Sequence, residues 1–409
     1  ARALIERAKS DATAYDLAEG LTTEVGPRLG GTDAEARARD WAVRALKRLG
    51  FKNVRIEPYT MSSWRRGEEN AAIVAPYSQR LVVAALGNSP ATPEGGVVGE
   101  VARFGTLAEL KAAPLTGFEG KIIFVDEPMT RTQDGSGYGV AVAKRSEATL
   151  EAAKRGAAAA LIRSVGTDST RFPHAGNMRL TDQRMAPAAA LSAVDADLLA
   201  SAIARAKQPV RVSLNLRPTR EEQAPSGNVV GEITGRTNDI IVVGGHLDSW
   251  DLGSGALDDA AGVAITAAAA KLVVDLKGKP RRTIRVVFWG AEEVGLHGAR
   301  AYAEAHKAEI GRHYAAAESD FGSGRVWKLD TRFGPDAALV SRALFDVLRP
   351  IGVGPGDNEA GGGADVGPLR DAGVPVFELN QDGSAYFDYH HTANDTLDKI
   401  DREDLAQNV

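Results

Sequence analysis

Short apolar runs alternate with longer stretches of helical periodicity through the second half of the chain. Residues 240–243 and 283–289 are mostly apolar runs rich in β-branched and aromatic side chains, which is typical of buried strands. Residues 314–317 form a weaker run of the same kind. Between them, the alanine-rich residues 260–276 predict a long helix. This alternation indicates an α/β fold, in which helices sandwich a mixed, mostly parallel sheet.

The first part of the chain is expected to start with two helices. Residues 1–26 alternate apolar and charged positions at helical spacing. Thr32 and Glu35 have the spacing of a capping box, which predicts a second helix over residues 34–49. Strands are predicted after this helix, over residues 52–61, 71–74 and 80–86.

Two changes in composition indicate an inserted domain. Residues 87–96 are rich in glycine and proline, and residues 217–227 are polar and contain two prolines. Between these linkers, strands and helices alternate again. The strands are predicted over residues 97–102, 121–125, 157–163, 187–191 and 210–216, and the helices over residues 142–155 and 194–207. We therefore predict an inserted α/β domain at residues 94–217, surrounded by a domain formed from residues 1–93 and 218–409.

The charge and the absence of cysteine exclude several classes of function. The net charge is −5 without a basic block, so we expect no nucleic-acid partner. No apolar run approaches the length of a membrane span, so we expect no membrane partner. Without cysteine there is no disulfide, thiolate metal site or cysteine nucleophile. The chain begins at Ala1 without a visible signal peptide, as expected of a processed periplasmic or secreted protein, and a cytoplasmic location stays open.

Carboxylates and imidazoles gather where the predicted strands end. The first strand is followed by His246, Asp248, Asp258 and Asp259. Later clusters consist of Glu292 and Glu293, Glu318 and Asp320, and His390 and His391. Because ligands bind at the carboxyl ends of the strands in an open α/β sheet, we expect these clusters to converge on one edge. Imidazole and carboxylate both suit zinc, so the pattern predicts a metal site.

Two neighbouring metal ions need one bridging carboxylate and about two further ligands each. The residues that can supply this set are His246, Asp258, Glu293, Asp320 and His391. Glu292 is the remaining acid, and we expect it to act as the general base that takes a proton from water held by the metals. Asp248 can accept a hydrogen bond from the ring nitrogen of His246 that does not bind metal.

The sequence resembles the co-catalytic di-zinc exopeptidases, a family that includes bacterial leucine aminopeptidases and glutamate carboxypeptidases. It is most similar to the plasma glutamate carboxypeptidase (blood dipeptidase) branch. The matching stretches are GGHLDSWDLGSGALDDAAG (244–262), FWGAEEVGLHGARAY (288–302), ESDFGS (318–323) and YFDYHHTANDT (386–396). The inserted segment resembles a protease-associated domain. The resemblance implies the zinc-exopeptidase fold, hydrolysis of dipeptides or short peptides, and pairing of two copies as a homodimer.

The resemblance also implies a role for each ligand. Asp258 would bridge two zinc ions, with a cis peptide bond to Asp259. His246 and Asp320 would hold one ion. Glu293 and His391 would hold the other.

His390 departs from the family pattern, because many relatives carry a tyrosine immediately before the last histidine ligand. If the chain is extended here, adjacent side chains point to opposite sides, and only one of His390 and His391 can bind metal. The spacing to Asp395 and Thr396 matches the family when His391 is the ligand, so the resemblance assigns the metal to His391 and the stabilisation of the oxyanion to His390. Tyr386 and Tyr389 are the alternatives for the oxyanion.

Two other classes of function are known alternatives to a peptidase on this fold. A glutaminyl-cyclase-like acyltransferase on the same fold would need one zinc ion, and a non-catalytic receptor-like protein would be expected to lack ligands or the base. The complete ligand set and the insert favour the peptidase. The sequence leaves open which end of a peptide is attacked.

Overall fold

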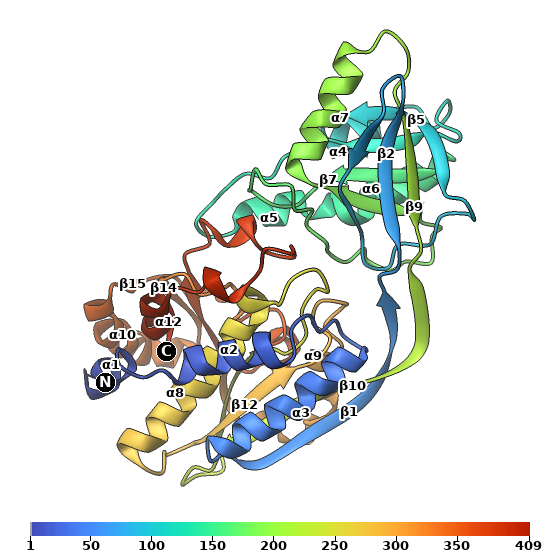
Figure 1. The fold of residues 1–409 in the computed structure, drawn as a ribbon. Helices are drawn as coiled ribbons and strands as arrows, with labels where there is room; N and C mark the ends of the chain where they lie inside the picture. Colours follow the sequence, from blue (N-terminus) through green and yellow to red (C-terminus); the bar gives the residue numbers. More distant parts are fainter. Residues whose placement is uncertain (1) are drawn as a thin grey trace. The chain divides into compact units, whose positions relative to one another are not determined.

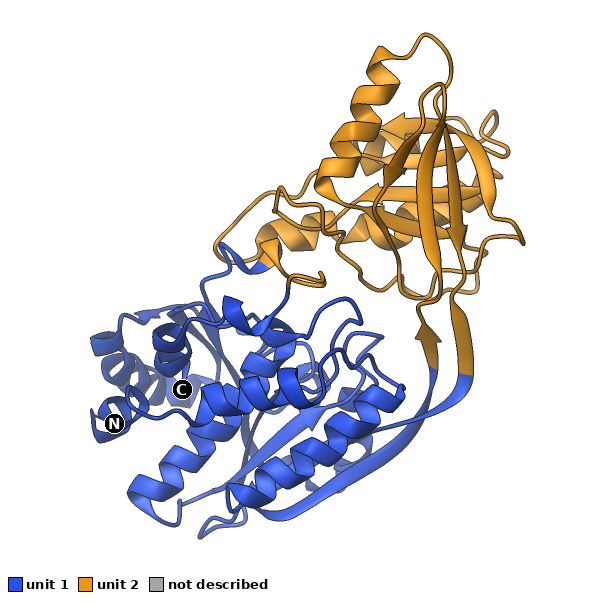
Figure 2. Cartoon of the chain, in the orientation of Figure 1, with its two compact units in different colours: residues 1–62, 222–386, 395–409 blue, residues 63–221, 387–394 orange. Residues whose placement is uncertain are grey.

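The structure, a computed structural model, describes residues 2–409 and divides the chain into two compact units (Figure 2). The first unit contains the residues up to Ser62, Glu222–Tyr386 and Asp395–Val409. The second contains Ser63–Glu221 and Phe387–Asn394. Each unit is built on its own eight-stranded sheet (Figure 1).

The sheet of the first unit has the order β1-β10-β12-β11-β13-β16-β14-β15. Its strands are β1 (Lys52–Arg65), β10 (Thr219–Ile233), β11 (Ile240–His246), β12 (Thr283–Trp289), β13 (His313–Glu318), β14 (Val326–Arg332), β15 (Gly354–Pro355) and β16 (Val376–Gln381). The central strand β11 is parallel to both β12 and β13, whereas β10 is antiparallel to β12 and β14 is antiparallel to β16. The predicted mixed α/β fold is confirmed.

Helices cover both faces of this sheet. They are α1 (Arg2–Ala8), α2 (Thr13–Glu24), α3 (Asp33–Arg48), α8 (Ala261–Lys277), α9 (His297–Ala305), α10 (Ala338–Leu348), α11 (Gly367–Asp371) and α12 (Arg402–Asn408). The alanine-rich α8 packs on β11 and against α2. On the other face, Tyr302 of α9 and Leu369 of α11 join a core that includes Val242 and Trp289. As predicted, Thr32 caps α3 by accepting a hydrogen bond from the backbone N–H of Glu35.

The second unit has a sheet of the order β3-β2-β9-β5-β6-β7-β8-β4. Its strands are β2 (Glu69–Ala75), β3 (Gln79–Leu81), β4 (Val83–Ala85), β5 (Val97–Phe104), β6 (Ile122–Val125), β7 (Ala159–Arg163), β8 (Ala188–Leu191) and β9 (Arg211–Leu216). Its helices are α4 (Leu107–Ala112), α5 (Ser136–Ala141), α6 (Ala143–Lys154) and α7 (Ala193–Arg205).

The second unit starts earlier than the boundary predicted at residue 94. Strands β2 and β4 belong to it, because β2 pairs with β9 and β4 pairs with β8. The turn-rich residues 87–96 therefore connect two strands of one sheet. The polar residues expected to form the second linker are instead part of the long strand β10. Their side chains are mostly exposed, so this strand lacks the apolar pattern by which the other strands were predicted.

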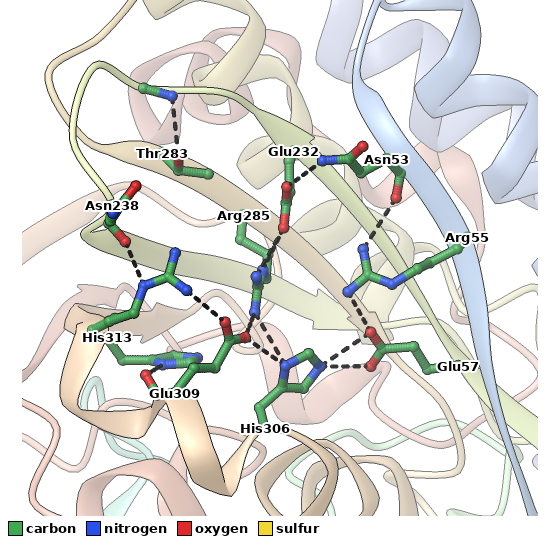
Figure 3. Close-up of polar contacts among 12 residues, drawn as sticks. Asn53, Arg55, Glu57, Glu232, Asn238, Thr283, Arg285, His306, Glu309 and His313 are labelled. Atoms are coloured by element: carbon green, nitrogen blue, oxygen red, sulfur yellow. Dashed lines mark hydrogen bonds and ion pairs between the residues drawn. The ribbon is translucent and has the colours of Figure 1, made fainter.

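A network of charged side chains ties β1, β10 and β12 to the segment after α9 (Figure 3). At its centre, Arg285 donates to Glu232 at 2.9 Å and to Glu309 at 2.5 Å. Both ring nitrogens of His306 face carboxylates, Nδ1 at 2.6 Å from Glu309 and Nε2 at 3.0 Å from Glu57. Within residues 2–409, no helix has the length and apolar character needed to cross a bilayer.

Candidate metal centre

The predicted clusters meet because three neighbouring strands are parallel. His246 of β11 lies opposite Trp289 of β12, and Gly244 lies opposite Glu318 of β13. The three strands therefore end at the same edge of the sheet. The loops that follow them bring together His246, Asp248, Asp258, Asp259, Glu292, Glu293 and Asp320. Of the four expected clusters, the three that lie in the first unit therefore converge, and the fourth, His390 and His391, belongs to the second unit.

His246 is fully buried and its two ring nitrogens face different groups. Nδ1 lies 3.0 Å from the carbonyl oxygen of Asp248, to which it donates. Nε2 lies 2.9 Å from Oδ1 of Asp258 and 3.3 Å from Oδ1 of Asp320. A neutral imidazole that donates from Nδ1 has only a lone pair at Nε2. Two carboxylate oxygens face this nitrogen, so either a proton or a metal cation has to lie between them and the ring.

The donor set fits a divalent metal. The ligand atoms of His246, Asp258 and Glu293 lie within 4.8 Å of one another, and so do those of His246, Asp259 and Asp320. One imidazole with several carboxylates is a donor set that suits zinc. His246, Asp258 and Glu293 are buried and Asp320 is partly exposed, so a metal would be held mainly by protein atoms and still be open on one side.

Asp259 has a structural role that the sequence did not indicate. Its carboxylate accepts from the backbone N–H of His246 at 3.0 Å and from that of Gly262 at 2.9 Å. It therefore joins the end of β11 to the first turn of α8 behind the metal site. The peptide bond between Asp258 and Asp259 is cis, as the resemblance implied. Glycine is required at Gly262, because a Cβ there would overlap the carboxylate of Asp259 and the carbonyl of Ser319.

Asp248 lies between the metal site and the loop after β12. We expected its carboxylate to accept from His246, but Oδ1 is 3.7 Å from Nδ1 and the main-chain carbonyl takes that place. The carboxylate instead accepts from the backbone N–H of Glu292 at 3.0 Å. The difference arises because the chain turns after β11, which brings the carbonyl oxygen of Asp248 back toward the ring.

Burial and mutual repulsion raise the pKa values of the clustered acids. Burial raises the pKa of Glu292 and of Glu293 well above the ordinary value, and the carboxylates around them add to the effect. Burial opposes protonation of His246, but the carboxylates of Asp320 and its neighbours outweigh it and raise its pKa well above the ordinary value. Without a metal, these groups would therefore bind extra protons. A divalent cation would offset the repulsion among the carboxylates and so favour their ionised forms.

Two further buried acids lie next to this cluster. The backbone N–H of Asp365 donates to Oε2 of Glu318 at 2.7 Å. Burial, followed by the charge of Asp320, raises the pKa of Glu318 to about 8. Both carboxylate oxygens of Asp365 are buried without a hydrogen-bond partner among residues 2–409. In the sequence Asp365 reads as an ordinary turn residue after three glycines, and nothing local to it indicates burial.

Tyr386 is buried at the end of the first unit. Burial raises the pKa of its hydroxyl well above the ordinary value, and the carboxylates of Asp258 and Asp320 raise it further. Its ring contacts that of Phe321 with 4.9 Å between the centroids. Tyr386 is therefore a neutral O–H group in the electric field of the predicted metal ligands.

His390 and His391 belong to the segment Phe387–Asn394, which packs within the second unit. Arg131 binds Asp388 at 2.6 Å and 3.0 Å, and Nδ1 of His174 donates to the carbonyl of His390 at 2.6 Å. The chain is not extended here: His391 has a φ of 62°, and the two rings stack with centroids 3.5 Å apart. Opposite orientation thus gives no reason to exclude one of them as a ligand.

Comparisons with known proteins agree on one family. The model of peptidase family M28 matches residues 228–409. Carboxypeptidase Q of Mus musculus is 34% identical over 96% of this chain and 82% of its own length. The crystal structure of a peptidase M28 precursor from Shewanella amazonensis is 48% identical, with a TM-score of 0.97 over 100% of this chain and 92% of that one. A zinc aminopeptidase from Bacillus subtilis shares the fold, with 20% identity and a TM-score of 0.69 over 97% of this chain and 91% of its own.

Proposed function

The chain belongs to peptidase family M28 and is a metal-dependent exopeptidase, and we propose that it uses two zinc ions to hydrolyse dipeptides or short peptides. The observation that carries the zinc proposal is the Nε2 atom of His246, which faces the carboxylates of Asp258 and Asp320 while Nδ1 donates elsewhere. The name of the Bacillus subtilis aminopeptidase supports zinc as the metal.

The proposed ligand sets follow the distances in the first unit. Asp258 would bridge the two ions, because it lies beside His246 and within the group that contains Glu293. His246 and Asp320 would complete one ion, and Glu293 would bind the other. The two groups of ligand atoms share His246, so the two ions would be close neighbours.

His391 is proposed as the remaining ligand, on evidence from the chain around it. It stands four residues before Asp395, whose carboxylate binds the backbone N–H of Asp258, and four residues span at most about 14 Å. Nδ1 of His391 has two contacts, 3.3 Å to the carbonyl of Ala175 and 3.5 Å to Arg145. If His391 binds a metal through Nε2, Nδ1 carries the hydrogen and can donate it to the carbonyl of Ala175.

Zinc supplies Lewis acidity, which polarises a peptide carbonyl and makes a nearby water more acidic. Glu292 accepts the proton of the attacking water and passes it to the leaving amine. Asp248 fixes the main chain of Glu292 and the ring of His246 at the same time. His390, or Tyr386 or Tyr389 in its place, would donate a hydrogen bond that stabilises the negative charge developing on the carbonyl oxygen.

The substrate proposal rests on the relatives. Similarity to carboxypeptidase Q extends over nearly the whole chain and includes the second unit, which supports a short peptide as substrate. We propose that the second unit corresponds to the protease-associated insert and limits substrate length. We also propose a periplasmic or secreted location, which the precursor form of the Shewanella amazonensis relative supports.

Metal content measured together with activity tests this function. The protein as purified, after incubation with zinc and desalting, should contain two zinc ions per chain. Prolonged chelation should abolish hydrolysis of dipeptides, and zinc or cobalt should restore it. One ion per chain would favour the acyltransferase class, and full hydrolysis by a sample verified to be free of metal would refute the proposal.

A further inference from the structure

The loop between His246 and Asp258 is held from one side by a buried arginine. The guanidinium of Arg28 donates to the carbonyl oxygens of Leu247 at 2.5 Å, Gly26 at 3.1 Å, Ser254 at 2.6 Å and Gly255 at 3.0 Å. Three of these four carbonyls belong to the loop. Arg28 is 0% exposed, so water cannot replace it as the partner of these carbonyls.

The same loop is held from the other side by Asp395. Oδ1 of this carboxylate accepts from the backbone N–H groups of Ala256 at 3.0 Å and Leu257 at 2.7 Å, and Oδ2 accepts from that of Asp258 at 3.2 Å. The main-chain carbonyl of Asp395 also accepts from the backbone N–H of Ser254 at 3.0 Å. Asp395 is 3% exposed.

The two residues complement each other chemically. The cation binds carbonyl oxygens of the loop, and the anion binds the first N–H groups of the short helical turn Ala256–Ala260, which have no partner within the turn. Buried backbone groups without a partner in their own element need one from elsewhere. Arg28 comes from the N-terminal part of the chain and Asp395 from the C-terminal part, so the loop is fixed by groups far away in sequence.

We propose that Arg28 and Asp395 are positioning residues, a charged clamp that sets the direction of the Asp258 carboxylate and the place of His246 for metal binding. This inference rests on the proposed function. Neither residue needs to touch a metal or a substrate. Arg28 acts on the residue next to His246, and Asp395 acts on the backbone of Asp258 itself. Substitutions in the clamp should therefore weaken metal binding, whereas an equally destabilising substitution elsewhere should not.

The test compares conservative variants of the clamp with a matched control. Arg28→Lys keeps the charge but loses the fork of donors, and Asp395→Asn keeps the shape but loses the charge. Arg155 is the control, because it is also buried and also donates to carbonyls, those of Leu110, Ala113 and Pro114 in the second unit. Arg155→Lys should destabilise the protein without reaching the metal loop.

Affinity for Zn²⁺ is measured by competition with a chelator, the geometry of the site from the absorption spectrum of the Co²⁺ form, and stability from the melting temperature of the metal-free protein. We expect Arg28→Lys and Asp395→Asn to bind Zn²⁺ about 10–100-fold more weakly, with an altered Co²⁺ spectrum. Arg155→Lys should keep the wild-type affinity and spectrum.

Two results would overturn the clamp. If the clamp variants lose stability as Arg155→Lys does but bind Zn²⁺ like the wild type, the residues are merely structural, and the proposed function stands. If the wild type itself binds no Zn²⁺, the proposed function fails and the clamp fails with it. Should Arg28→Lys not fold, Asp395→Asn decides by the same measurements.

Discussion

The carboxylate of Asp248 accepts a hydrogen bond from the backbone N–H of Glu292 at 3.0 Å, while the carbonyl of Asp248 accepts from the ring of His246. One residue therefore orients both a proposed zinc ligand and the proposed general base. The two loops that follow β11 and β12 are joined at this point, so a displacement of one loop displaces the other.

Asp248→Asn should reduce activity without removing the metals. The amide oxygen can still accept from the N–H of Glu292, and the main-chain carbonyl that orients His246 is unchanged. Loss of the negative charge should lower kcat by about 10–100-fold, as is typical for groups that support metal ligands. Kinetics and zinc content measure this effect. Asp275→Asn, an exposed change on α8, serves as the control and should match the wild type. Wild-type kcat in Asp248→Asn would show that its charge has no role.

Glu292→Gln and Glu293→Gln should fail in different ways. Glu292→Gln should keep both zinc ions and lose about 10²–10⁴-fold in kcat, because only proton transfer is removed. Glu293→Gln should lose or weaken the binding of one ion. Elemental analysis beside steady-state kinetics distinguishes the two variants. Loss of zinc from Glu292→Gln, with Glu293→Gln retaining both ions, would show that the two roles are exchanged.

His391→Ala should lose one zinc ion, and His390→Ala should retain both. Because the two rings stack, each deletion also removes a packing contact, so the melting temperature of each metal-free variant provides the baseline. The melting temperatures show how much each deletion destabilises the fold, and the zinc content of the folded variants then assigns the ligand. If His390→Ala is the variant that loses the ion, the register of the ligand is wrong by one residue.

Tyr386→Phe tests which group stabilises the oxyanion. Removal of one such donor typically lowers kcat by about 10²–10³-fold with little change in KM. If Tyr386 is the donor, Tyr386→Phe shows this loss and His390→Ala does not. If His390 is the donor, the pattern is reversed. Phe321→Leu, which changes the ring packed against Tyr386 without removing a hydroxyl, is the control for packing.

Glu309→Gln should lower stability at neutral pH but much less in acid. Burial raises the pKa of Glu309, but hydrogen bonds and charge from Arg285 and His306 outweigh burial and lower this pKa from its ordinary 4.5 to about 2. Because this pKa is lower in the folded protein than in the unfolded chain, the ionised carboxylate stabilises the fold at any pH above the unfolded-state pKa. This stabilisation is lost as pH falls from about 4.5 toward 2. We expect a loss of about 1.5–3 kcal/mol at pH 7, the range for a hydrogen bond to a charged group.

Urea denaturation of Glu309→Gln and the wild type across this pH range measures the difference. Glu304→Gln is the control, since Glu304 is exposed on α9 and its carboxylate lies 3.8 Å from an exposed lysine. A difference between Glu309→Gln and the wild type that does not shrink in acid would contradict the assignment.

The metal loops could be predicted because the chemistry is local in sequence. His246 and Glu292 each follow an apolar strand, and a parallel arrangement brings such positions together. What supports them could not be predicted. Arg28 and Asp395 lie in segments with no apolar periodicity, and, apart from the carbonyl of Gly26, their partners in the clamp are backbone atoms more than a hundred residues away. A carboxylate or guanidinium that binds distant backbone leaves no pattern in its own neighbourhood.

The domain boundary illustrates the same limit. Residues 87–96 have the composition of a linker, but composition cannot distinguish a connection between domains from one between two strands of a sheet. Strands β2 and β3 are short, and only their pairing with β9 and with each other shows where they belong. The polar first half of β10 was overlooked for a related reason, since an exposed strand lacks the apolar alternation on which prediction relies.

The eight residues Phe387–Asn394 have a consequence for the modularity of this protein. The chain leaves the first unit at residue 62 and returns at 222, then leaves again at 386 and returns at 395. The second unit is therefore discontinuous, and no single cut and ligation can excise it or transplant it. Joining residues 62 and 222 would leave the segment Phe387–Asn394 in the chain but remove its partners, among them Arg131 and His174. Gain or loss of this unit as a cassette would have to be accompanied by changes near the C-terminus, in the segment that carries His390 and His391.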